Sequence, residues 1–176
     1  SMKLKILSLV AAAGLFFASC GTTYQTTSDN AAYNVNVPTN IRGNFAASYP
    51  DATNVVWNSF DVNVVPVDWE LTGWTALGAD DFAVTFDMGG NRYYAWYDAN
   101  GNLIGSAYAV NDHSRLPLAV SNLLKDKYST YTIGGIQREM WGSQTAYEIK
   151  LKGNDDTKIK LLIDTNGNII KEKLKD

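Results

Sequence analysis

The chain has 176 residues, of which 45% are hydrophobic and 19% charged, so it can bury a core and extensive disorder is not expected. A formal net charge of −3 gives no reason to expect a nucleic-acid partner. The single cysteine excludes an internal disulfide and a cysteine-based zinc site.

The first residues have the pattern of an export signal. Lys3 and Lys5 precede an apolar run at residues 6–17 that is too short to span a bilayer, and Ala18-Ser19-Cys20 follows it. Small residues before a cysteine are typical of a bacterial lipobox, although Phe17 departs from the usual leucine. We expect a signal peptide over residues 1–20 and lipid attachment at Cys20, which predicts a lipoprotein on the periplasmic side of the outer membrane or at the cell surface of a Gram-negative bacterium. The alternative is an ordinary secretory signal with an incidental cysteine.

The next segment links this signal to the folded part. Residues 21–36 are rich in Thr, Ser, Asn and Ala and lack an apolar period, so they predict a flexible tether, with an edge strand at residues 33–37 as the alternative. Ile41, Phe45 and Tyr49 then follow one another at intervals of four behind Pro38. This spacing predicts a helix over residues 38–48.

Two stretches of the chain repeat the same design. Leu116-Pro117 and the apolar residues at 120, 124 and 128 repeat the helix pattern, and an Asp-x-Asn-Gly-Asn turn between apolar runs occurs at residues 98–102 and 164–168. The turn predicts a hairpin in which Gly101 and Gly167 adopt the left-handed conformation and Asp98 and Asp164 accept hydrogen bonds from backbone amides. We therefore expect two tandem repeats, residues 37–113 with an insertion at 61–80, and residues 114–176.

Alternation of apolar and polar residues defines the strands. Residues 145–151 and 159–163 alternate between apolar and mostly charged side chains, which predicts an antiparallel sheet with one buried and one wet face. Strands are also expected at 82–86, 92–97, 132–140 and 168–173. The predicted fold class is α+β: each repeat is a helix plus a four-stranded antiparallel sheet, the sheets lie side by side, and both helices pack on one face.

The open sheet face is the candidate binding surface. Aligning the repeats places Tyr93, Ala95 and Tyr97 inward. Arg92, Tyr94 and Trp96 alternate with them and therefore point to the open face. Contiguous exposed aromatics commonly mark an interaction site. Two tryptophans lie in the insertion, for which a longer hairpin is one possible structure, and they are either core residues or further contacts. The tryptophans at 57 and 141 suit core or edge packing. The candidate site is therefore Arg92, Tyr94 and Trp96 together with Trp69 and Trp74.

Charge is distributed unevenly between the predicted repeats. Residues 37–113 contain two basic and nine acidic side chains, whereas residues 114–176 contain eleven basic and eight acidic ones. The two halves thus carry −7 and +3 charges. This predicts a dipole along the repeat axis that would orient a charged partner.

Catalytic and metal-binding patterns are absent from the sequence. His113 is the only histidine and lies in a polar link between the repeats, and we find no nucleophile motif, phosphate loop or paired-histidine spacing. The Asp-x-Asn-Gly-Asn turns lack the glycine position and closing glutamate of a calcium loop. We expect no cofactor, no metal and no enzymatic activity.

The combined motifs resemble a known family. The lipobox signal, the two proline-led helices ending near tyrosine, and the closing Asp-x-Asn-Gly-Asn hairpins are similar to PepSY-like periplasmic proteins of unknown function, and the resemblance covers residues 37–173. These resemble the beta-lactamase inhibitor protein in architecture, although its disulfides are missing here. The resemblance implies a lipid-anchored, non-enzymatic module that binds an unknown protein partner on the open sheet face, with enzyme inhibition as one form. The alternative is a carbohydrate-binding lipoprotein that stacks Trp and Tyr rings on sugars.

Overall fold

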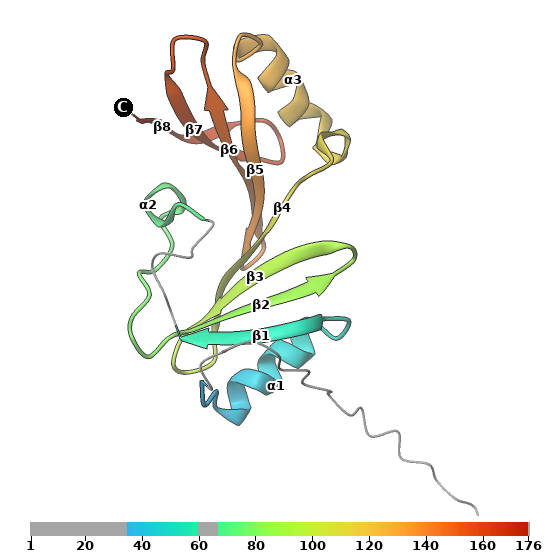
Figure 1. Cartoon of the computed structure of the whole chain (residues 1–176), viewed down its shortest axis with the longest axis vertical. Coiled ribbons are helices and arrows are strands. Elements are labelled where there is room, and N and C mark those ends of the chain that lie inside the picture. Colours follow the sequence, from blue (N-terminus) through green and yellow to red (C-terminus); the bar gives the residue numbers. More distant parts are fainter. Residues whose placement is uncertain (1–34, 60–66, 176) are drawn as a thin grey trace, which may run out of the picture.

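The computed structural model describes residues 35–59 and 67–175, in which the chain forms one eight-stranded antiparallel sheet with a few helices (Figure 1). The strands lie in the sheet in sequence order. The mixed α and β composition and the antiparallel pairing agree with the prediction. The elements are α1 (Thr39–Ser48), β1 (Thr53–Ser59), α2 (Trp69–Thr72), β2 (Phe82–Met88), β3 (Asn91–Tyr97), β4 (Leu103–Ala109), η2 (His113–Arg115), α3 (Leu118–Lys127), β5 (Thr132–Trp141), β6 (Gln144–Lys152), β7 (Lys158–Asp164) and β8 (Ile169–Lys175).

Several predicted features lie outside the described residues: the signal peptide, Cys20, most of the tether and the first part of the insertion. Within the described ranges, no helix combines the length and apolar character needed to cross a bilayer. Residues 35–38 contain no strand.

Helix α1 covers the first half of the sheet. It follows Pro38, it buries Ile41 and Phe45, and the backbone N–H of Tyr49 closes its last turn on the Phe45 carbonyl. The Phe45 ring meets Phe86 of β2 edge to face, with the ring centroids 5.0 Å apart. This arrangement places the apolar residues of β2 and β3 beneath the helix, where they form one core cluster with it: Val37, Ile41, Phe45, Val84, Phe86, Ala95 and Tyr97.

Helix α3 covers the second half in the same way. Val120 and Leu124 are buried against β6 and β7. The main buried strand residues of this second core are Ile149, Leu151, Ile159, Leu161 and Ile163. Because β-strand side chains alternate between faces, the strand register places α1 and α3 on the same face of the sheet, which we call the helix face.

Pairing of β4 with β5 joins the two halves into one sheet. The register runs from Ser106 opposite Met140 to Ala109 opposite Gln137. The two halves therefore share one continuous hydrogen-bonded sheet, and Figure 1 shows β4 and β5 running through the middle of the molecule.

The two Asp-x-Asn-Gly-Asn turns have matching geometry. Asp98 Oδ1 accepts hydrogen bonds from the backbone N–H groups of residues 100 and 102 at 2.9 and 2.8 Å, and Asp164 Oδ1 does the same for residues 166 and 168 at 2.8 Å. These hydrogen bonds lower the pKa of both aspartates, the side-chain amide of the closing asparagine contributing most. Gly101 and Gly167 have φ values of +90° and +83°, which an L side chain rarely adopts.

The prediction of a longer hairpin in the insertion is wrong for its described part, residues 67–80. A single helical turn, α2, forms instead, because the Asp68 side chain accepts a hydrogen bond from the backbone N–H of Leu71 at its start. Gly73, with φ +69°, ends the turn in the left-handed conformation.

Glycine substitutions should test the geometry of both turns. Gly101→Ala should lower the free energy of unfolding by about 1–2 kcal/mol, because a Cβ is costly in the left-handed region and would also lie 3.1 Å from the side-chain nitrogens of Asn40 and Asn44. Gly167→Ala should cost more, since its Cβ would also lie 2.8 Å from the Ala119 carbonyl oxygen of α3. Urea denaturation measures both values.

Gly43 provides the control for this series. It lies within α1 with nothing within 4 Å of an added Cβ, so Gly43→Ala should stabilise the protein by about 0.5–1 kcal/mol. Equal effects of Gly101→Ala and Gly43→Ala would contradict the assigned turn geometry.

Candidate functional site

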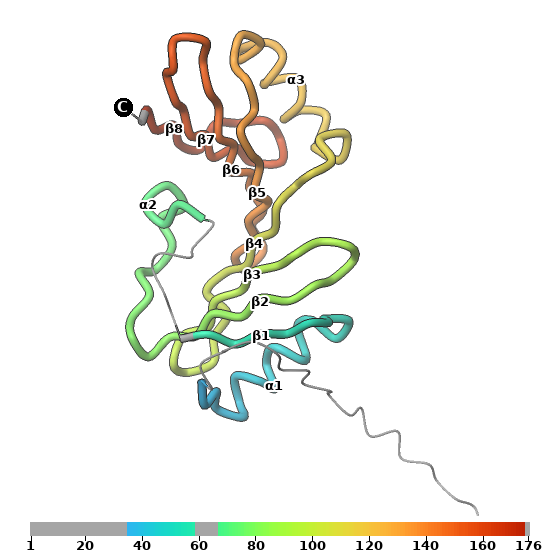
Figure 2. Tube along the Cα trace, in the orientation of Figure 1, coloured from blue at the N-terminus to red at the C-terminus, as the bar shows by residue number. Residues whose placement is uncertain are grey.

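The α2 segment lies on the sheet face opposite α1 and α3, which we call the α2 face. Figure 2 shows α2 beside the strands of the second half, although α2 belongs to the first half of the sequence. Leu71 of α2 is buried against Ala146 of β6 and Leu162 of β7. The face is therefore partly covered by the insertion, and the expectation that it is open is wrong for this part of the sheet.

Four tryptophans and a tyrosine pack together on this face and form an aromatic cluster. It consists of Trp69, Trp74, Tyr94, Trp96 and Trp141, drawn from the insertion, β3 and β5. The Trp69 ring lies 4.9 Å from Trp96 and 5.2 Å from Trp74, measured between centroids and close to perpendicular in both pairs. Trp74 in turn contacts Trp141 at 5.6 Å. Edge-to-face packing of this kind fixes the rings against one another and excludes water.

A glycine in β4 makes room for this cluster. A Cβ at Gly105 would lie 2.6 Å from the Trp74 ring, so only glycine permits the ring to rest on the strand. Trp69 Nε1 donates to the Thr75 carbonyl at 2.8 Å and helps to hold the segment after α2 in place. The sequence of β4 is thus adapted to the insertion that covers it.

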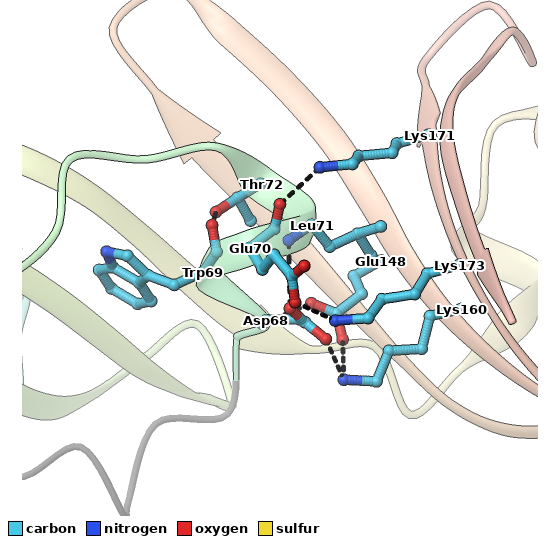
Figure 3. Close-up of polar contacts among 9 residues, drawn as sticks. All are labelled: Asp68, Trp69, Glu70, Leu71, Thr72, Glu148, Lys160, Lys171 and Lys173. Carbon is cyan, nitrogen blue, oxygen red and sulfur yellow. Dashed lines mark hydrogen bonds and ion pairs between the residues drawn. The ribbon is translucent and has the colours of Figure 1, made fainter. Parts of the chain in front are cut away.

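Charged groups hold α2 on the second half (Figure 3). Lys160 Nζ of β7 lies 2.6 Å from Asp68 Oδ2 and 3.8 Å from Glu148 Oε1 of β6. Asp68 also donates its backbone N–H to Glu148 Oε2 at 2.9 Å. Burial alone would raise the pKa of Asp68, but the bond from Lys160 and the Leu71 N–H lower it below its ordinary value. Asp68 is therefore ionised in the docked state.

Two lysines of β8 complete the docking of α2. Lys171 Nζ donates to the Glu70 carbonyl at 2.7 Å, and Lys173 pairs with the Glu70 carboxylate. Figure 3 shows the three lysines approaching α2 from the neighbouring strands β7 and β8.

A second buried carboxyl group lies beside Glu148. Glu139 of β5 is 0% exposed and Glu148 is 1% exposed, and both Glu139 carboxyl oxygens are buried without a hydrogen-bond partner in the described structure. Burial, followed by the proximity of Glu148, raises the pKa of Glu139 to about 9. Glu139 is therefore neutral at physiological pH.

Lysines dominate the rest of the α2 face in the second half and form what we call the lysine surface. Strand alternation places six described lysines on this face: Lys150, Lys152, Lys158, Lys160, Lys171 and Lys173. Lys150, Lys160 and Lys173 are neighbours across three strands. The +3 half of the chain thus concentrates positive charge beside the docked acidic turn.

The structure corrects the predicted exposure of the candidate residues. Trp96 does lie on the face opposite α1, but it is only 2% exposed, and Trp74 is 9% exposed, because the two rings cover each other. Trp69 and Tyr94 are half-buried. Arg92 is exposed and pairs with Asp87 at 3.0 Å, away from the aromatic cluster.

The sequence reasoning did not identify the lysine surface or the buried glutamates. The alternating lysines of β6, β7 and β8 were a visible signal for the former. No sequence signal distinguishes Glu139 and Glu148 from ordinary glutamates on a wet face. Among the described residues, no group of three His, Cys, Asp or Glu side chains is placed to hold a metal ion.

The antiparallel sheet, with α1 and α3 on its helix face and the single turn α2 on the opposite face, defines the class of this protein as an α+β fold of the beta-lactamase-inhibitor-like type. The chain belongs to the PepSY-like family, described as beta-lactamase-inhibitor-like, which it matches over residues 80–171. No curated protein matches the sequence.

Solved structures from Bacteroides species share the fold. A DUF2874 family protein from Bacteroides uniformis is 18% identical with a TM-score of 0.61, and the alignment covers 78% of this chain and 89% of that one. A BLIP-like protein from Bacteroides fragilis is 17% identical with a TM-score of 0.62 and coverages of 78% and 85%. A protein from Bacteroides eggerthii described as periplasmic is 14% identical with a TM-score of 0.60 and coverages of 78% and 88%.

Glu139 should make stability fall as pH rises. In the fold this carboxyl stays protonated to about pH 9, whereas in the unfolded chain it ionises near about pH 4. Between these values the unfolded state gains stability relative to the folded state, by at most about 1.4 kcal/mol per pH unit. Glu139→Gln removes this effect, so it should exceed the wild type in unfolding free energy near neutral pH, with the advantage shrinking toward about pH 4.

Chemical denaturation of both proteins across this pH range measures the difference. A pH-independent difference would show that Glu139 ionises freely in the folded protein.

Gly105→Ala should detach Trp74 from β4. The added Cβ overlaps the ring, so we expect a loss of about 1–3 kcal/mol of stability and a red-shifted tryptophan emission as water reaches the aromatic cluster. Gly135→Ala is the control, because it lies in β5 with nothing within 4 Å of an added Cβ. Unchanged emission in Gly105→Ala would contradict the packing of Trp74.

Proposed function

We propose that this protein is a non-enzymatic module that binds a protein partner on the α2 face. The observation that carries the proposal is that this face already binds a peptide segment, the insertion, through Leu71, the aromatic cluster and ion pairs to lysines. A surface that holds a short helical turn by these contacts has the chemistry of a peptide-binding groove.

The lysine surface supports an acidic partner. Asp68 and Glu70 of α2 pair with Lys160 and Lys173, which shows the kind of group that fits there. Beyond α2, no acidic side chain among the described residues pairs with Lys150 or Lys158. These two lysines line a shallow depression of about 350 Å³ with Gly134, Lys152 and Lys160. An acidic segment of the partner would occupy this depression and continue the row of carboxylates that α2 begins.

The predicted aromatic residues take different parts in this proposal. Trp69 and Tyr94 retain exposed area and would contact the partner beside α2, and Arg92 lies exposed on the same face. Trp74 and Trp96 are buried and would support the contact surface from beneath. Burial of these two rings removes them as platforms for sugar stacking, so the aromatic cluster favours a protein partner over a carbohydrate.

We also propose that the protein is exported and lipid-anchored at Cys20, with residues 21–36 as its tether. The signal-like sequence supports this, and the description of the similar Bacteroides eggerthii protein as periplasmic is consistent with it. Inhibition of an enzyme is one form that partner binding could take, given the likeness to a BLIP-like protein.

We infer further that the two halves are copies of one repeat. Each half contains a proline-led helix followed by four antiparallel strands, and each ends in an Asp-x-Asn-Gly-Asn turn and one more strand. The insertion with α2 is present only in the first copy, which leaves the second copy's lysine face free to receive it.

Loss of two lysines should weaken binding of an acidic peptide. A fluorescent peptide of alternating glutamate and serine serves as the probe, and its affinity is measured by anisotropy. Lys150→Gln with Lys158→Gln should lower the affinity roughly tenfold, the effect of two partly screened ion pairs. Raising the salt concentration should weaken wild-type binding in parallel.

The control is Lys125→Gln with Lys127→Gln, which removes the same charge from exposed positions on α3. Equal losses in both double variants would reveal general charge attraction and overturn the proposed surface. A second control is the same peptide with glutamine in place of each glutamate. If it binds as tightly as the acidic peptide, the proposed surface is overturned as well.

A further inference from the structure

A second cleft lies on the opposite side of the sheet. On the helix face, a cleft of about 490 Å³ is bordered by the turn between β2 and β3 at residues 89–91 and by residues 110–115, which lead into α3. Its floor is a row of side chains that are direct neighbours across four strands of the sheet: Tyr93, Tyr108, Arg138 and Tyr147. The cleft therefore lies where β4 and β5 join the two halves.

Arg138 is the unusual member of this row. It is half-buried, and no carboxylate in the described residues lies within ion-pair distance of it. Its Nη1 donates to the Tyr108 hydroxyl at 3.0 Å, and its guanidinium carbon lies 5.8 Å from the centre of the Tyr108 ring. Its Nε is buried without a hydrogen-bond partner. A guanidinium has five N–H donors, so donors beyond the one bound to Tyr108 are available to a ligand.

Such an arrangement is costly without a ligand. The guanidinium is half-buried, and its buried Nε–H has lost water without gaining a hydrogen bond in the described structure, which costs free energy that an anion would offset. The hydrogen bond to Tyr108 raises the pKa of Arg138 above its ordinary value, so the positive charge persists. The planar fork of an arginine matches a carboxylate with two parallel hydrogen bonds.

The surroundings of Arg138 indicate the rest of the ligand. The Tyr93 and Tyr108 rings lie 4.6 Å apart beside the guanidinium and offer apolar surface to a ring. Asn91, Asn111 and Arg115 border the cleft with polar groups. Asp112 also borders it, but its Oδ1 accepts hydrogen bonds from the backbone N–H and the hydroxyl of Ser114 at 3.0 and 2.7 Å. The volume is in the range of small-molecule sites.

We propose that this cleft binds a small carboxylate carried on a ring, with the carboxylate on Arg138 and the ring against the tyrosines. The site is separate from the α2 face, so it stands or falls independently of the proposed protein partner. It would give the module a soluble ligand as well as a protein partner.

Nuclear magnetic resonance titration of the full chain tests the site. Benzoate is compared with its neutral analogue benzyl alcohol, and glucuronate with glucose. In each titration the Arg138 Nε–H signal is followed. At least one acid should shift this signal and bind about tenfold or more tightly than its analogue, since a charge-assisted bidentate pair contributes more than 1.4 kcal/mol. The stronger acid shows whether the ring is aromatic or a sugar.

Arg138→Met should abolish this binding while keeping the fold, because methionine replaces the apolar stem of the half-buried arginine and no ion pair in the described residues is lost. A thermal melt checks the fold, and Lys125→Gln, an exposed charge on α3, is the control that should bind like the wild type. Unchanged binding in Arg138→Met, or equal binding of each acid and its neutral analogue, would overturn the proposal.

Discussion

The pairing of β4 with β5 is the interaction on which the other features of this molecule depend. Its four residue pairs turn two four-stranded units into one sheet with two faces. On the helix face, α1 and α3 each cover their own half, and the strand residues around the junction form the floor of the Arg138 cleft, which the β2–β3 turn and residues 110–115 border. On the other face the junction provides a continuous surface, across which the insertion reaches from the first half to the second.

The free energy of docking α2 on the sheet has favourable and unfavourable contributions. Burial of Leu71 and the tryptophan rings contributes hydrophobic stabilisation of about 1.5–3 kcal/mol for each large side chain. Against this stands Glu139, which must be neutral in the fold, and Glu148, which shares Lys160 with Asp68. A buried polar group that is only partly satisfied destabilises its neighbourhood. The ion pairs of α2 therefore serve to specify its position on the lysines, and the aromatic cluster supplies most of the attraction.

Local patterns were sufficient to predict the elements and their faces, but not what covers those faces. Alternation correctly placed Tyr93, Ala95 and Tyr97 beneath α1 and Trp96 opposite. The burial of Trp96 could not be foreseen, because it depends on an insertion that itself docks through contacts such as Asp68 with Lys160, distant in sequence. The Arg138 row likewise requires the β4–β5 register between the halves. The lysine surface, in contrast, follows from strand alternation alone and could have been predicted.

The docking of α2 explains part of the uneven charge of the two halves. Asp68 and Glu70 belong to the half with charge −7 and dock on lysines of the half with charge +3, so part of the dipole is neutralised within the molecule. The neutralisation stops at the end of α2, where Lys150 and Lys158 face the depression without an acidic partner in the described structure. Clustered lysines repel one another, and that repulsion is relieved when an anion binds among them. On β6 and the start of β7 such relief comes, among the described residues, only from the pair of Lys152 with Asp156 at 2.8 Å, so the repulsion at Lys150 and Lys158 is the physical basis of the acidic partner proposed above.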